Sequence, residues 1–331
     1  MATVFRNCLC GNPKVLESCK LYLFPILMKA FLNKLLLFTV SYLAFILIII
    51  FASAQSATIE KYTFHNRSNH GETVYRIPEF RQTIKDNKSL ELLFLGSSTC
   101  YRGINPNKFD SITPETFSLC SSSQTLHVSN ELLQWAGKLG VRPETIILDV
   151  YPMIWDFSST EAIHDLVRND PSPFDPMFLQ IAFRTRDLHT MLTALYFGLK
   201  DWILPSIPKP NNKYVGKGFT YSTGEPTKPI PCESALTVLS SEQNSAMLQI
   251  KKTADNWKSS LILVNPPQLC EETFNVPEVM TQMHWIDGNE WPLAKVDSLY
   301  FDDHHLRGVG AELYSEWLAK RVKVVLNLEH H

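Results

Sequence analysis

The chain is poor in charged residues. Asp, Glu, Lys and Arg make up 19% of its 331 residues, against about 25% in typical soluble domains, which indicates that one segment does not lie in water. The 31 basic and 33 acidic residues nearly balance, and no run of Lys and Arg occurs. This excludes a broadly basic nucleic-acid-binding protein, because such proteins hold phosphates through clustered positive charge.

Motifs for common cofactors and metals are also missing. The sequence contains no P-loop, no H-E-x-x-H motif and no C-x-x-C pair, which are the patterns of nucleotide, zinc-protease and zinc-ribbon or thioredoxin sites. Gly216 and Gly218 lack a third glycine and follow no predicted strand, so they do not form a dinucleotide-binding loop. We therefore expect no cofactor and no metal.

The seven cysteines fall into two groups. Three lie in the first 34 residues, and the others are Cys100, Cys120, Cys232 and Cys270. Two disulfides among these four are one possibility if this part of the chain is exported. A domain of this size does not need crosslinks for stability, so we expect free, buried thiols instead.

One long apolar segment is present, and it covers residues 35–54. No charge occurs between Lys34 and Glu60, and about twenty apolar residues span the hydrocarbon core of a bilayer. The preceding residues 1–34 carry five basic side chains against the single acid Glu17. The positive-inside rule then predicts a cytoplasmic N-terminal segment, a membrane anchor and an extracytoplasmic remainder.

A cleaved signal sequence is the alternative for the same segment. The stretch that begins at Met28 has a basic start, an apolar core and Ala52-Ser53-Ala54 as a cleavage site, and residues 1–27 would then come from a misassigned start codon. The apolar run is longer than a usual signal core, so we favour an anchor. With either an anchor or a cleaved signal, residues 55–327 would be exported. A cleaved product would be secreted. Residues 328–331 resemble the remnant of an expression tag.

The exported part alternates short apolar runs with helical patterns. Strands are predicted at 90–95, 115–119, 145–150 and 260–265, and amphipathic helices at 129–139 and 311–325. This alternation favours a three-layer α/β domain with a parallel sheet. Ser129 or Asn130 is the expected cap of the first helix.

An irregular insertion is predicted at about residues 152–259. Within it, 178–204 has a helical, apolar pattern, and 205–231 contains six prolines, which indicates an extended excursion. Long loops in compact domains often act as lids over functional sites. A surface loop without such a role is the alternative.

A turn of small residues follows the strand at 90–95. Gly96-Ser97-Ser98 would lie at the carboxyl end of a parallel strand, where α/β proteins place reactive groups. Ser98 would then begin a helix whose free N–H groups can stabilise an oxyanion. Alternatively, the serines only cap that helix.

A second reactive pattern lies more than 200 residues later, in the segment 300–311. Asp302 and His305 are three residues apart, so a tight turn can bring them together. The aspartate would orient the imidazole, whose other nitrogen would accept a serine proton. As metal ligands, the adjacent His304 and His305 would tend to point in different directions, and no third clustered ligand is evident. Helix capping by Asp302 is the structural alternative.

The two segments together resemble the first and last motif blocks of the SGNH/GDSL hydrolases. The blocks are LGSSTCYRGINP, from Leu95, and FDDHHLRGVGAELYSEWLA, from Phe301. They are most similar to exported, membrane-anchored members whose nucleophile motif is G-S-S. The resemblance implies a flavodoxin-like sheet, Ser98 as nucleophile, His305 as base and Asp302 as the residue that orients it.

The sequence departs from this family in its two other blocks. The family's oxyanion-hole glycine is replaced by Cys120, within Ser118-Leu119-Cys120-Ser121-Ser122-Ser123-Gln124, and the asparagine of the third block is missing after Asp149. The oxyanion candidates are then the backbone N–H groups of Ser98 and Cys120 and the side chain of Gln124. A structural hydrogen bond is the alternative role for Gln124.

These observations predict an esterase or O-acyltransferase that acts on O-acyl esters, such as acetyl esters of a cell-surface glycan. The alternative is a catalytically degenerate accessory protein that binds glycan or a membrane O-acyltransferase. The expected partners are therefore an acylated glycan, the membrane through residues 35–54 and, in the second case, that acyltransferase.

Overall fold

The computed structural model divides the chain into two compact units, Met1–Thr63 and Phe64–His331. It describes residues 13–56, 76–86, 89–157, 159–169, 180–183, 188, 191–192, 194–196, 213–222, 238–270 and 276–329. The principal helices and strands are α2 (Pro13–Gln55), α4 (Arg76–Asp86), β1 (Leu92–Leu95), α5 (Ser98–Gly103), β2 (Thr116–Ser118), α6 (Leu126–Lys138), β3 (Thr145–Asp149), α7 (Thr160–Asn169), β4 (Tyr214–Gly216), β5 (Phe219–Thr220), α10 (Ser241–Trp257), β6 (Ser260–Asn265), α11 (Glu278–Thr281), β7 (His284–Asp287) and α12 (Gly308–Glu329). Short 3-10 helices lie at Pro106–Phe109 (η1), Pro152–Asp156 (η2), Gly288–Glu290 (η3) and Asp297–Leu299 (η4).

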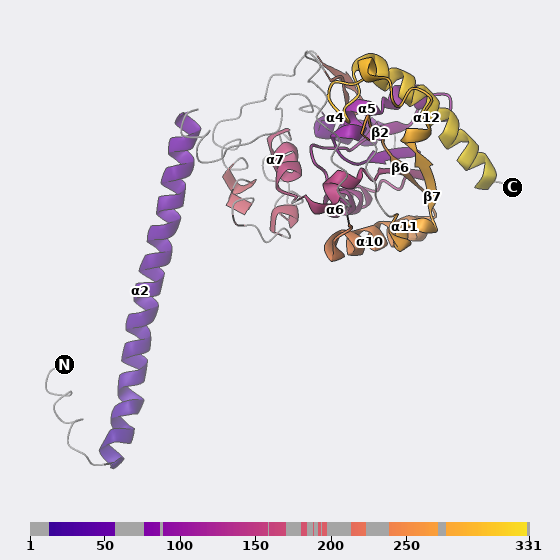
Figure 1. Cartoon of the computed structure of the whole chain (residues 1–331). Coiled ribbons are helices and arrows are strands. Elements are labelled where there is room, and N and C mark those ends of the chain that lie inside the picture. Colours follow the sequence, from indigo (N-terminus) through magenta and orange to yellow (C-terminus); the bar gives the residue numbers. More distant parts are fainter. Residues whose placement is uncertain are drawn as a thin grey trace. The chain divides into compact units, whose positions relative to one another are not determined.

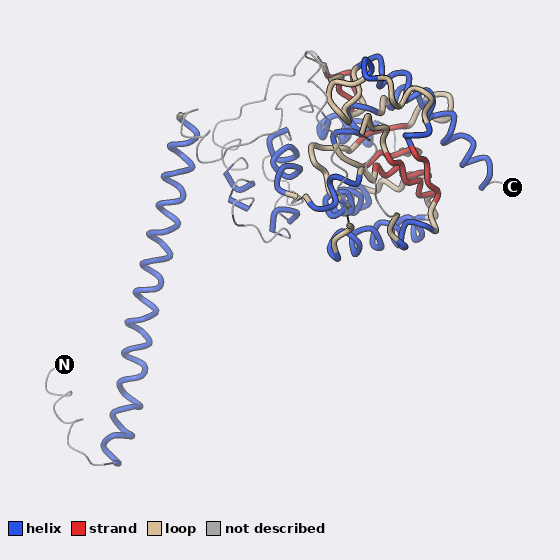
Figure 2. The backbone as a smooth tube through the Cα atoms, viewed as in Figure 1, coloured by secondary structure: helices blue, strands red, loops and turns tan. Residues whose placement is uncertain are grey.

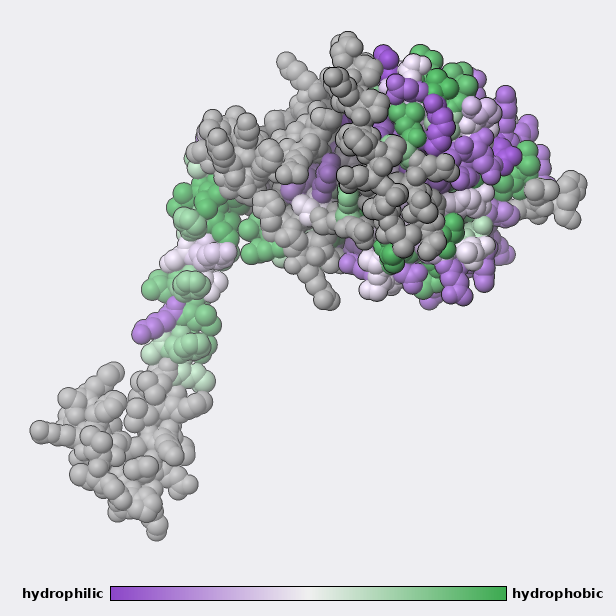
Figure 3. Space-filling model, viewed as in Figure 1, coloured by the Kyte–Doolittle hydropathy of each residue, from purple (hydrophilic) through white to green (hydrophobic). Residues whose placement is uncertain are grey.

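The first unit contains the apolar helix α2. Its part Met28–Ser53 has the length and composition of a membrane span, and 26 residues at a rise of 1.5 Å extend over about 39 Å. Figure 3 shows mainly hydrophobic side chains over the described part of this helix. A signal sequence near an N-terminus has the same properties. The predicted apolar segment 35–54 lies inside α2.

The second unit is built on a five-stranded sheet with the order β2-β1-β3-β6-β7, and every neighbouring pair is parallel. Leu92 lies opposite both Thr116 and Thr145, and Thr145 lies opposite Ser260. Counted along the chain, this is the order 2-1-3-4-5 that flavodoxin and other doubly wound proteins share. The predicted α/β class with a parallel sheet is confirmed.

Helices cover both faces of the sheet, as Figures 1 and 2 show. Helices α6 and α10 pack together on one face, and α5 and α12 pack together on the other. Alternate strand residues such as Leu92 and Phe94 join a core with Tyr314 and Leu318 of α12. All four residues of β1 are buried, as expected for a strand covered on both sides.

The predicted elements are present with shifted ends. Helix α6 begins at Leu126 and is capped by Thr125, whose hydroxyl accepts a hydrogen bond from the N–H of Val128. The predicted caps Ser129 and Asn130 are therefore wrong, because the buried Leu126 and Val128 extend the helix by one turn. The edge strand β7 has no counterpart among the predicted strands.

The region 152–259 is regular where the structure describes it. Helix α10 packs on α6 and belongs to the helical layer on that face of the sheet. The hairpin β4–β5 lies along the sheet edge, where the N–H of Ser118 donates to the carbonyl of Lys217 over 2.9 Å. Gly218, at φ +81°, is so close to this edge that a Cβ would lie 2.0 Å from the carbonyl oxygen of Ser118. Most of the predicted segments 178–204 and 205–231 lies outside the described residues.

The prediction of free thiols is wrong for Cys100, Cys120 and Cys270. Cys100 and Cys120 form a disulfide between α5 and the loop after β2, and Cys270 is also disulfide-bonded. Cys232 lies outside the described residues. The size of the core does not decide whether the thiols pair, because the parallel pairing of β1 with β2 brings the two segments that carry Cys100 and Cys120 together.

Candidate active site

The predicted nucleophile lies at the carboxyl edge of the sheet. Strand β1 ends at Leu95, and Ser98 is the first residue of α5, so its N–H has no acceptor within that helix. Gly96 between them has φ +151°, and a Cβ there would lie 2.3 Å from the Cβ of Asp149. Only glycine lets the chain turn this closely past the end of β3.

Asp149 holds the turn that carries the nucleophile. Its buried carboxylate accepts hydrogen bonds from the hydroxyls of Thr99 and Ser97 and, over 2.9 Å, from the N–H of Tyr151. Burial raises the pKa of Asp149 to about 6, against the opposing effect of these hydrogen bonds. The residues on both sides of Ser98 are therefore tied to the neighbouring strand.

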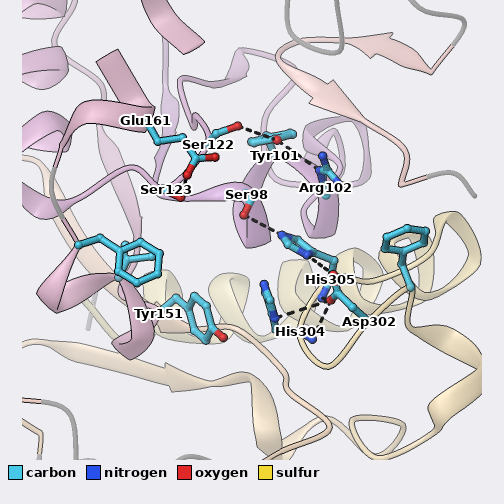
Figure 4. A pocket seen from close by; sticks show the side chains of 13 residues that line it. Ser98, Tyr101, Arg102, Ser122, Ser123, Tyr151, Glu161, Asp302, His304 and His305 are labelled. Carbon is cyan, nitrogen blue, oxygen red and sulfur yellow. Dashed lines mark hydrogen bonds and ion pairs between the residues drawn. The ribbon is translucent and has the colours of Figure 1, made fainter. Parts of the chain in front are cut away.

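Ser98, His305 and Asp302 form a continuous hydrogen-bonded chain (Figure 4). The distance from Ser98 Oγ to His305 Nε2 is 2.7 Å, and the distance from His305 Nδ1 to Asp302 Oδ2 is also 2.7 Å. The serine and the histidine are 207 residues apart in the sequence. The predicted proximity of the three residues is present in the structure.

The loop before α12 fixes the geometry of the histidine. Asp302 Oδ1 accepts the backbone N–H groups of His304 and His305 over 3.0 and 2.7 Å, so the aspartate closes its own turn as well as orienting the imidazole. The N–H of Phe301 donates to the carbonyl of His305, and the N–H of Arg307 donates to the carbonyl of Leu299. Since Gly308 begins α12, the loop is anchored to a rigid helix.

The electrostatics suit a base and its orienting acid. Burial lowers the pKa of His305 to about 4, although its hydrogen bond to Asp302 acts in the opposite direction. The imidazole is therefore neutral near pH 7 and can accept a proton at Nε2. Burial opposes ionisation of Asp302, but hydrogen bonds from His305 and the nearby imidazoles hold the pKa of this carboxyl well below its usual range.

His304 lies against the same loop rather than pointing away. Its ring centroid is 4.0 Å from that of His305, and its Nδ1 is 2.7 Å from Asp303 Oδ1. The expectations of diverging histidines and of no third clustered ligand are both wrong, because the backbone N–H groups of His304 and His305 turn toward Asp302, which joins the cluster. Potential metal-ligand atoms of Asp302, His304 and His305 lie within 4.8 Å of one another, so this cluster could hold an ion. An ion bound through either nitrogen of His305 would displace the hydrogen bond that this nitrogen makes, to Ser98 at Nε2 or to Asp302 at Nδ1.

A pocket of about 300 Å³ opens over these residues. Its lining residues are Ser98, Tyr101, Arg102, Ser122, Ser123, Tyr151, Ile154, Phe157, Glu161, Phe301, Asp302, His304 and His305. The volume is at the lower end of the range for small-molecule sites. Hydroxyl and charged groups outnumber the apolar side chains Ile154, Phe157 and Phe301, so the pocket suits a small polar ligand.

Two of the three oxyanion candidates lie away from this pocket. The Gln124 side chain accepts from Ser121 Oγ over 2.7 Å and donates to Ser129 Oγ over 3.0 Å; it is fully buried and has the structural role that was the alternative. Cys120 is held in the disulfide and, like Gln124, does not line the pocket. Ser98 remains, with its backbone N–H at the start of α5.

Several residues of the site, in the pocket or beneath the nucleophile, were not singled out from the sequence. Asp149 was noted only as the position before a missing asparagine, and Tyr151, Ser123 and Glu161 were not proposed at all. The signal for Asp149 was present, because a carboxylate that ends a buried parallel strand lies at the reactive edge of such a sheet. No local pattern predicted Glu161, which reaches the pocket from the separate helix α7.

Comparisons with protein-family models, with curated proteins and with solved structures found no match to this chain. Its function is therefore inferred from the geometry of its own residues.

Proposed function

We propose that the chain is a serine hydrolase or acyltransferase of the SGNH/GDSL type, acting on O-acyl esters through an acyl-Ser98 intermediate. The observation that carries the proposal is the Ser98–His305–Asp302 hydrogen-bonded chain, in which both links measure 2.7 Å. The triad lies at the carboxyl edge of a parallel sheet, and a pocket opens in front of Ser98. Both features support acyl transfer through Ser98.

The mechanism follows from the hydrogen bonds that join the three side chains. Ser98 Oγ attacks the ester carbonyl carbon while its proton passes to Nε2 of His305, and Asp302 stabilises the resulting imidazolium. The tetrahedral oxyanion lies near the backbone N–H of Ser98. The C–O bond to the alcohol then breaks, and His305 protonates the departing oxygen.

Deacylation repeats the steps in reverse. Water or an acceptor hydroxyl gives its proton to His305 and attacks the acyl carbon, and the protonated histidine returns the proton to Ser98. Water gives hydrolysis and an acceptor hydroxyl gives transfer. The small volume of the pocket favours a short acyl group, such as acetyl, and its polar lining favours a glycan as the alcohol part of the ester.

We further propose that the domain is exported and anchored through α2. Two observations support this location. The helix has the dimensions of a membrane span, and the domain contains the disulfide Cys100–Cys120, a bond that persists in oxidising compartments and is rare in the cytosol.

Hydrolysis of p-nitrophenyl acetate by the purified full chain tests the enzymatic proposal. Ser98→Ala is expected to remove at least about a thousandfold of the activity, while the exposed Ser241→Ala on α10 controls for loss of a serine hydroxyl. Both variants should melt within a few degrees of the wild type. A folded wild type without esterase activity would favour the accessory protein that binds glycan or a membrane acyltransferase.

A further inference from the structure

Glu161 brings a carboxylate to the wall of the pocket. It is the second residue of α7, is half-buried and lines the same cavity as Ser98. Its Oε2 accepts a hydrogen bond from Ser123 Oγ over 2.8 Å, the single hydrogen bond to this side chain among the described residues. An ionised carboxylate can accept about four, so most of its capacity is available to a ligand.

The loop that meets Glu161 is held in place by another residue. Ser123 has φ +46°, a left-handed conformation that is costly for a residue with a side chain and that often occurs at functional sites. The N–H of the preceding Ser122 donates to Asp165 Oδ2 over 3.0 Å, and Asp165 is buried beside Arg76. Since Asp165 already anchors the loop, anchoring alone does not account for a carboxylate in the pocket.

The position of Glu161 relative to the triad suggests which part of an ester it meets. Figure 4 shows Glu161 and Ser123 on one side of Ser98, with His305 on the other. An acyl chain laid against Glu161 would strip water from a carboxylate without replacing its hydrogen bonds, which is unfavourable. Hydroxyl groups of a polyol would donate to it, and hydrogen bonds to an ionised acceptor are among the stronger ones.

We propose that Glu161 is a specificity-determining residue that accepts hydrogen bonds from hydroxyl groups on the alcohol part of the ester. The substrate class is then an ester of a polyhydroxylated, sugar-like alcohol. This inference rests on the proposed function for its reaction, but the binding of the alcohol does not require catalysis.

The test compares two esters, p-nitrophenyl acetate and a mono-O-acetylated methyl glucoside, with the full chain and its variants. Glu161→Gln is expected to lower the ratio of kcat/KM for the glucoside to that for the aryl ester by about tenfold, mainly through KM, because a charged acceptor becomes neutral. The matched control is Glu242→Gln, which removes a carboxylate from the second residue of α10 and is expected to leave the ratio unchanged.

Binding separates this inference from the catalytic proposal. In Ser98→Ala protein, line broadening of methyl glucoside in NMR spectra is expected to reveal binding that Glu161→Gln weakens. If binding is seen in this way but the wild type has no esterase activity, the proposed sugar site at Glu161 stands and the proposed hydrolase activity is refuted. Equal losses on both esters, reproduced by Ser123→Ala, would show that Glu161 only supports the loop and would overturn the inference.

Discussion

Asp149 makes the stability of the protein depend on pH in a direction opposite to that of most carboxylates. Its pKa rises from an ordinary 3.8 to about 6 because it is buried, so the folded state binds a proton more tightly than the unfolded state. The resulting stabilisation is fully present below about pH 3.8 and is lost as the pH rises through about 6. A pKa difference of about 2 corresponds to about 3 kcal/mol.

The variant Asp149→Asn isolates this contribution, because it keeps the size of the side chain and does not titrate. The free energies of unfolding of wild type and variant would be measured by urea titration with tryptophan fluorescence, using the full chain in mild detergent. When the pH is lowered from about 7.5 to about 4.5, the free energy of unfolding of the wild type should increase by about 2 kcal/mol relative to that of the variant. Other titrating groups occur in both proteins and cancel in this difference. A difference that stays constant with pH, or that changes in the opposite direction, would refute a buried, proton-binding Asp149 beneath the nucleophile.

Four further predictions concern the base, the disulfide, the metal alternative and the anchor. Esterase kcat/KM should fall as the pH drops through about 4, because burial lowers the pKa of His305; a midpoint above 6.5 would contradict a buried neutral base. Replacing Cys100 and Cys120 together by alanine should cost about 3 kcal/mol of unfolding free energy, since their bond closes a loop with a sequence separation of 20; an unchanged urea midpoint would argue against the bond. Hydrolysis should persist in a metal chelator, whereas activity lost to the chelator and restored by zinc would favour a metal at the catalytic loop. The full chain should remain in membranes after carbonate washing, and a mature N-terminus at Gln55 would instead establish a cleaved signal.

The sheet could be predicted because its strands are apolar on both faces. The runs at 90–95, 145–150 and 260–265 correspond to β1, β3 and β6, since only a doubly covered strand buries every side chain. Strand β7, with the sequence His284-Trp285-Ile286-Asp287, lies at the edge of the sheet, where the exposed His284 and the partly exposed Asp287 interrupt the apolar pattern.

The triad could be predicted from the sequence, whereas the rest of the pocket could not. Ser98 and the Asp302–His305 pair each follow from local spacing, and the edge of the sheet brings them together. Glu161 approaches from α7, and its place depends on how that helix packs against the loop at Ser123. Such a contact between separate elements leaves no local sequence pattern. Gln124 failed as an oxyanion candidate because its neighbours Ser121 and Ser129 use both ends of its amide.

The most direct test of the account is covalent labelling of the nucleophile. The wild-type chain would be treated with a fluorophosphonate, digested and examined by mass spectrometry, with His305→Ala as the comparison. The 2.7 Å hydrogen bond between Ser98 and His305 predicts a single phosphonylated serine at position 98 and a labelling rate at least about a hundredfold lower without the imidazole. A folded wild type that remains unlabelled at Ser98, or a labelling rate unaffected by His305→Ala, would contradict an activated serine in this pocket.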